Sequence, residues 1–208
     1  MLFELKVGRI KSSAGSTEET RGSKHGALLV AQDSARYQEA VEQGNVYGSA
    51  SQAGVTSQAG LSATTPVLTL YNPSGSGKNA VIWYLGATFL VAFAAAAAIF
   101  IAVGTDTVAA AVTGTLTTAH RNMKLGASSN NACKTYLAAT LPAAPVAVGL
   151  LGAGLTGAIT TVPVAKSLER WVGGAIILKP GSNLSLQTST ASGASGMLCE
   201  YIWEEVDE

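Results

Sequence analysis

Hydrophobic and polar residues are unevenly distributed along the chain, and the longest apolar pattern lies near its middle. Within residues 66–105, a short strand-like run ends at a turn over residues 72–78, and 24 uncharged residues follow at 80–103. This second run begins with β-branched and aromatic residues, which favour strand over helix. Strands that are covered on both faces have continuous apolar sequences. We therefore predict two buried strands here, joined by a small-residue segment around residues 94–98.

A membrane span is the main alternative for the same run. A helix needs about 20 apolar residues to cross a bilayer core, and residues 141–165 form a second uncharged run that could be its partner. The second run contains Pro142, Pro145 and Pro163, which disfavour a helix, and no basic cluster flanks either run. We predict no membrane association and keep a two-span membrane protein, such as a small pore or holin-like factor, as the alternative.

Turn residues divide the rest of the chain into short strand-like segments. In residues 197–205, Cys199, Tyr201 and Trp203 alternate with more polar positions, as in a strand with one buried face. About eight strands separated by Gly, Pro, Asn and Ser turns indicate an all-β fold, an antiparallel β-sandwich or jelly roll over residues 46–208. The predicted strands are residues 66–71, two within 80–103, 107–118, one or two within 135–163, 173–178, 184–190 and 197–205.

Residues 1–45 differ from this body in composition. Residues 1–26 are rich in charge, Gly and Ser and have no hydrophobic period, so we predict an extended N-terminal arm. Ser34 suits the N-cap and Gly44 the C′ position of one short helix over residues 34–43. Apolar and basic side chains of this region are the candidate contacts with a larger assembly: Phe3, Leu5, Arg9, Lys11, Arg21, Lys24, Leu28, Arg36 and Tyr37.

Charge is balanced in total but uneven in position. The 13 basic and 13 acidic residues cancel, so nothing indicates a nucleic-acid partner. Only Lys78 and Asp106 are charged between residues 51 and 120, which leaves a body rich in Ser, Thr, Ala and Gly. Such a surface suits contact with other subunits, and we expect an oligomer. The N-terminus carries an acid at Glu4 and no long apolar stretch, unlike a secretory signal peptide.

The turn at Gly75-Ser76-Gly77-Lys78 imitates the end of a phosphate-binding loop. In the pattern GxxxxGK[ST], a glycine would stand at position 72 and a hydroxyl at position 79, where this chain has Asn72 and Asn79. An Asn-Pro-Ser-Gly string is ordinary turn chemistry. We therefore predict a turn and no nucleotide site.

Few other residues offer catalytic or metal-binding chemistry. His25 and His120 are far apart and in no metal-ligand spacing, which favours solvated loop histidines. Cys133 and Cys199 are too few for a disulfide framework and are expected to be free core thiols. No GxSxG nucleophile motif occurs. We predict no catalytic residue, no cofactor, no metal and no enzyme activity.

We interpret the adjacent C-terminal glutamates and the three tryptophans as structural residues. Glu204 and Glu205 are adjacent in a strand and would point to opposite faces, which suits a solvated terminus better than paired acid–base catalysis. Trp83, Trp171 and Trp203 are most simply core or subunit-contact residues.

Three parts of the chain together carry a resemblance to a known family. They are GALLV, ARYQEA and GNVY within residues 26–47, LTLYNPSGSGKN at 68–79, and PG at 180–181 with YIWEEV at 201–206. This arrangement resembles a family of tailed-bacteriophage virion proteins. The resemblance implies a jelly-roll capsid cement or decoration protein, made in the host cytoplasm and placed on the outer surface of the capsid. The implied partners are the major capsid protein and other copies of this chain, as a homotrimer.

Two further interpretations remain open. A head-fibre base or tail component of the same virion would share this fold, and location in the particle would distinguish it. A carbohydrate-binding sandwich would be favoured by Trp or Tyr side chains on the surface.

Overall fold

The computed structural model describes residues 37–91, 93, 95–107, 110–117, 119–154, 167–194 and 196–208. The chain divides into two units, residues 1–39 and 40–208, and the second contains every strand of the described residues. The predicted arm therefore lies almost entirely outside the described residues. Helix α1, Gln38–Glu42, falls within the range predicted for a short helix.

Eleven strands are present among the described residues. Their bounds are β1 Val46–Ala50, β2 Leu68–Asn72, β3 Lys78–Phe89, β4 Ala97–Thr105, β5 Thr113–Leu116, β6 Arg121–Asn122, β7 Lys134–Thr140, β8 Val146–Gly154, β9 Ser167–Leu178, β10 Ser182–Thr188 and β11 Met197–Asp207.

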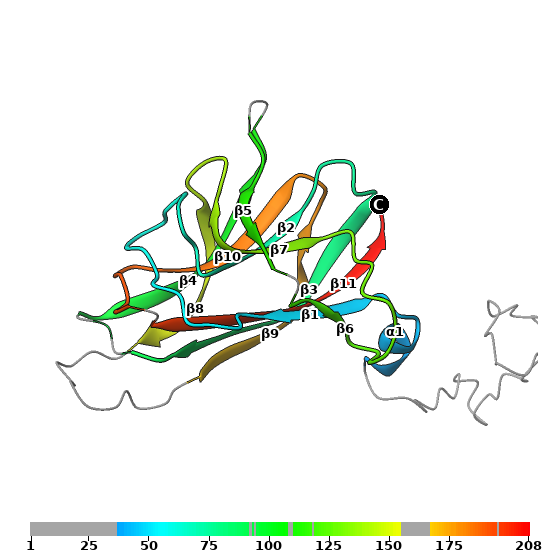
Figure 1. The fold of residues 1–208 in the computed structure, drawn as a ribbon, viewed down its shortest axis with the longest axis horizontal. Helices are drawn as coiled ribbons and strands as arrows, with labels where there is room; N and C mark the ends of the chain where they lie inside the picture. The colour runs from blue at the N-terminus through cyan, green and yellow to red at the C-terminus, as the bar shows by residue number, and fades with distance from the viewer. Residues whose placement is uncertain are drawn as a thin grey trace, which may run out of the picture. The chain divides into compact units, whose positions relative to one another are not determined.

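The strands form two antiparallel sheets, with orders β6-β1-β11-β3-β9 and β5-β7-β2-β10-β4-β8. Figure 1 shows the C-terminal strand β11 between β1 and β3. If β5, β6 and β7 are set aside, the remaining strands pair in a nested order: β1 with β11, β2 with β10, β3 with β9, and β4 with β8. One long hairpin folded across two sheets produces this order, which is that of a jelly roll. The predicted all-β antiparallel sandwich is confirmed.

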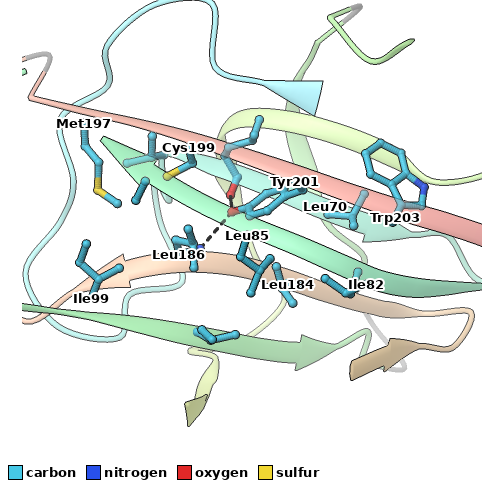
Figure 2. Close-up of a cluster of buried hydrophobic side chains, with 14 of the residues drawn as sticks. Leu70, Ile82, Leu85, Ile99, Leu184, Leu186, Met197, Cys199, Tyr201 and Trp203 are labelled. Carbon is cyan, nitrogen blue, oxygen red and sulfur yellow. Dashed lines mark hydrogen bonds between the residues drawn. The ribbon is translucent and has the colours of Figure 1, made fainter. Parts of the chain in front are cut away.

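The long apolar run supplies one inner strand to each sheet. It becomes β3 in one sheet and β4 in the other, joined by residues 90–96, so the prediction of two buried strands is confirmed. Alternate residues of these strands, such as Leu85 and Ile99, lie in the core between the sheets (Figure 2). Among the described residues, no helix is long and apolar enough to cross a membrane.

The hydroxyl of Tyr201 joins the two sheets inside this core. It donates a hydrogen bond to the carbonyl of Leu68 at 2.8 Å and accepts one from the Leu186 amide at 3.1 Å, as Figure 2 shows for Leu186. The ladder between β10 and β2 ends at Ser185 and Thr69, so the next rung would join Leu186 to Leu68. Tyr201 from the opposite sheet occupies that rung, and it satisfies two backbone groups that would otherwise be buried without a partner.

Glu205 is buried, which corrects the prediction of a solvated terminus. The period of two along β11 places it on the same face as Tyr201 and Trp203, and it is only 6% exposed. Its carboxylate accepts hydrogen bonds from the amides of Ala132 and Cys133 at 2.8 and 2.9 Å and from the Trp203 indole at 3.2 Å. These three donors offset the desolvation of the charge.

Much of the polar segment 120–134, which begins with the predicted loop histidine His120, is exposed, but part of it is held in the body. It contains β6, and Asn122, Asn131 and Cys133 within it are buried. The Asn122 side chain donates to the Gly44 carbonyl at 2.6 Å, which closes the segment onto the start of the body. His120 is half-buried, and burial lowers the pKa of its imidazole.

Both cysteines are free and buried, as predicted. Burial raises the pKa of each thiol, and the Glu205 carboxylate raises that of Cys133 further. Both thiols therefore remain protonated and serve as small apolar core groups.

Replacing Tyr201 by Phe removes the bridging hydroxyl but keeps the ring. The buried Leu186 amide and Leu68 carbonyl then lose their partner, and we expect the free energy of unfolding to fall by about 1–3 kcal/mol. Chemical denaturation monitored by tryptophan fluorescence measures this difference. Tyr136→Phe, at a half-buried tyrosine of β7, is the control, and an equal loss in both variants would contradict the bridging role.

Candidate functional site

The described structure brings almost none of the sequence-predicted contact residues together. Phe3, Leu5, Arg9, Lys11, Arg21, Lys24, Leu28 and Arg36 lie outside the described residues. Tyr37 is partly buried in the turn that precedes α1. The candidate surfaces must therefore be built from the sandwich itself, and two of them stand out.

The first surface is the outer face of the five-stranded sheet. Leu85 of β3 and Tyr201 of β11 point into the core, so their strand neighbours Tyr84 and Glu200 point outward. The register places Glu200 opposite Gly86 and places Glu169 of β9 opposite the same glycine on its other side. Three strands therefore place one tyrosine and two carboxylates side by side.

The Tyr84 hydroxyl lies between the two carboxylates. Its oxygen is 2.9 Å from Oε1 of Glu200 and 3.0 Å from Oε2 of Glu169. A phenol has a single proton to donate, so it can satisfy only one of the two at a time. The two carboxylates therefore meet at the Tyr84 hydroxyl, which donates fewer hydrogen bonds than they can accept.

Trp171 extends this group across the sheet. It stands opposite Tyr84 in the β3–β9 register, and the two rings meet edge to face with centroids 5.1 Å apart. Its side chain is 56% exposed. The sequence named Trp171 as a core or subunit-contact residue, and its exposure excludes the core. The charged neighbours Glu169 and Arg170 were the signal that this part of β9 faces solvent.

Gly86 determines how Glu200 reaches Tyr84. A Cβ built on Gly86 would lie 2.7 Å from Cγ of Glu200 and closer still to Oε1. The carboxylate side chain therefore lies across the bare backbone of β3, in space that any other residue would fill. A small pocket of about 150 Å³ borders Glu200 and includes Gly86 and Thr88 in its lining. We call Tyr84, Gly86, Glu169, Trp171 and Glu200 the aromatic–acidic face.

The electrostatics of this face follow from its geometry. Burial raises the pKa of the Tyr84 phenol, and the hydrogen bonds to Glu200 and Glu169 raise it further, because a phenolate would face two carboxylates. The neighbouring Glu204 also has a raised pKa through burial, partly offset by a hydrogen bond from Trp83. Tyr84 is therefore a neutral donor at physiological pH.

The second surface is the outward side of β8, an edge strand of the six-stranded sheet. Val146, Val148 and Leu150 are 66%, 55% and 59% exposed. Val148 is the extra residue of a bulge between the Ala147 and Gly149 rungs, so the three side chains are neighbours along an exposed edge but do not follow a strict period of two. We call these three residues the β8 apolar row.

The contact between the Glu200 carboxylate and the Tyr84 hydroxyl can be broken while the rings of Tyr84 and Trp171 are retained. In Glu200→Gln the neutral amide no longer opposes a phenolate, and in Gly86→Ala the new methyl group displaces the Glu200 side chain. We expect the pKa of Tyr84 to fall toward its ordinary value in both variants. Nuclear magnetic resonance of ¹³Cζ-labelled tyrosine during a pH titration measures it.

Thr88→Ala, two residues further along the same face of β3, is the matched control for this titration. An unchanged Tyr84 pKa in Glu200→Gln would contradict the geometry of the aromatic–acidic face.

Comparisons with known proteins identify no relative of this chain. No family model matches it, no curated protein is significantly similar to it, and no solved structure matches it significantly. The functional interpretation therefore depends on the geometry of this chain and on its sequence.

Proposed function

We propose that this chain is a structural virion protein, a cement or decoration protein that binds and stabilises a shell of major capsid protein. The observation that carries the proposal is the β8 apolar row, three aliphatic side chains that are more than half exposed on one edge strand. The jelly-roll strand order and the resemblance of the sequence to tailed-phage virion proteins support it. In this proposal the protein lies on the outer surface of the capsid and assembles as a homotrimer.

The β8 apolar row favours assembly because its exposure is costly. Transfer of a fully exposed Val or Leu side chain from water stabilises a contact by about 1.5–3 kcal/mol, and exposed apolar edge strands invite pairing. Three such residues in one row provide a contact without any deep pocket. On a capsid, the same contact repeats many times, so weak individual interfaces add through avidity.

The sparse charge of the body agrees with a surface that is largely covered. Most of the sandwich between β2 and β8 displays Ser, Thr, Ala and Gly in place of Lys and Glu. Interfaces between subunits are depleted in charged side chains at their centres. The predicted arm adds basic residues that could reach across a lattice to a second protein.

Binding to capsids tests the function. Purified protein added to particles that lack it should co-sediment with them at a saturating, fixed ratio to the major capsid protein. Replacing Arg9, Lys11, Arg21, Lys24 and Arg36 by Gln should weaken this binding, because the arm loses five of its six basic side chains. Replacing Lys124 and Lys179 by Gln is the control for the loss of positive charge from the body.

Failure of the unmodified chain to bind capsids would contradict the cement function. If the arm variant binds as well as the unmodified protein, the arm does not contribute to the contact with the capsid. Gold-labelled antibody seen at the tail or at fibre attachment points, in place of the whole shell, would support the head-fibre base or tail alternative.

Assembly through the β8 apolar row is tested by Val148→Glu. A buried glutamate at the centre of the row would oppose subunit contact, and we expect the species to shift toward the 21.1 kDa monomer in sedimentation velocity. Leu116→Glu on β5, at the opposite edge of the same sheet, is the control. A Val148→Glu protein of unchanged mass would place the subunit contact elsewhere.

A further inference from the structure

The aromatic–acidic face combines two features that select the same kind of ligand. Trp171 offers an exposed aromatic ring in edge-to-face contact with Tyr84. Glu169 and Glu200 place two carboxylates on the Tyr84 hydroxyl. We propose that this face binds a positively charged side chain, a lysine or arginine presented by a protein partner. The proposal goes beyond the capsid function and does not depend on it.

Charge complementarity is the first argument. Among the described residues, a side-chain ion pair is present between Lys78 and Asp207. Neither Glu169 nor Glu200 forms an ion pair within this part of the chain. Arg170 follows Glu169 in sequence, yet its guanidinium donates to the Leu150 carbonyl at 3.4 Å. A cation that enters this face would supply the donors that the single phenol proton cannot provide.

The aromatic rings are the second argument. A cation is attracted to the face of Trp or Tyr when it lies within about 6 Å of the ring centroid, and the attraction is greatest for Trp. Trp171 and Tyr84 are 5.1 Å apart, so a group beside one ring is near the other and near both carboxylates. Lysine and arginine also carry apolar stems that can cover the exposed indole.

The open shape of the site favours a side chain over a free small molecule. Trp171, Glu169 and Glu200 are exposed, and the pocket of about 150 Å³ beside Glu200, which the rings do not line, is smaller than the roughly 300–1,000 Å³ typical of small-molecule sites. A partner protein brings its side chain to an open face and needs no enclosing cavity. An exposed tryptophan could also stack on a sugar ring, but a neutral saccharide would leave the paired negative charges uncompensated.

Gly86 is part of this site because it has no side chain to occupy the space beside Tyr84. Its missing side chain lets Glu200 lie across β3 and join Glu169 at Tyr84. Any larger residue would separate the two carboxylates and weaken the field at the rings. The proposal therefore assigns a function to a glycine whose φ value is not unusual.

The test uses the full chain and a probe with a matched uncharged analogue. Nuclear magnetic resonance follows the Trp171 indole while N-acetyl-lysine methylamide is added, and N-acetyl-norleucine methylamide supplies the same stem without charge. We expect saturable shifts at millimolar concentration with the lysine probe and at least tenfold weaker binding of norleucine. Added salt should weaken the lysine interaction, because the attraction is largely electrostatic.

Variants locate the interaction on this face. Glu169→Gln combined with Glu200→Gln should reduce binding of the lysine probe at least tenfold, and Gly86→Ala should reduce it to a smaller extent. Glu204→Gln, on the same face of β11, is the control and should bind as the unmodified protein does. Amide spectra of each variant report whether its fold is retained.

Three outcomes would overturn the proposal. They are equal binding of the lysine and norleucine probes, lysine binding that survives the double glutamine substitution in a folded protein, and shifts of the Trp171 indole by cellobiose but not by lysine. The last of these would assign a saccharide to the face in place of a cation.

Discussion

The structure depends on one hydroxyl group that is shared by two sheets. Tyr201 belongs to β11, yet it completes the hydrogen bonding of β10 and β2 across the core. The apolar contacts between the two layers are not directional, and the other polar links between them include Ser49 with Thr135 and the Asn72 side chain with the Leu178 carbonyl. The Tyr201 hydroxyl adds direction, because it can satisfy the Leu186 amide and the Leu68 carbonyl in one register only. That register determines which side of β11 is buried.

From this constraint the two faces of β11 acquire separate roles. Cys199, Tyr201, Trp203 and Glu205 face inward, where the first three fill the core and Glu205 anchors the loop before β7. Glu200 faces outward, where it meets Tyr84 and Glu169. A slip of one residue would exchange the two sets and bury Glu200 without donors. The aromatic–acidic face is thus a product of the same pairing that stabilises the core.

The two candidate surfaces differ in chemistry and in place. The β8 apolar row lies at an edge of the six-stranded sheet and suits contact between subunits. The aromatic–acidic face lies on the other sheet and suits a cationic partner. If the proposed capsid function and the proposed cationic partner both hold, the protein needs two such surfaces that do not compete. Their placement on different sheets permits both contacts in one assembly.

The sequence by itself determined the fold class, because a period of two and frequent turn residues are local signals that survive without tertiary context. It also determined that residues 80–103 form two strands, through β-branched residues at their start, and that the core face of β11 includes Tyr201. The period of two places Glu205 on the face of Tyr201, but only the tertiary structure supplied the Ala132 and Cys133 amides that allow a carboxylate to be buried there. The meeting of Tyr84, Glu169 and Glu200 was likewise invisible in sequence, since nested pairing brings together residues that are 85 and 116 positions apart. Local patterns specify the elements, and the register between distant strands specifies the site.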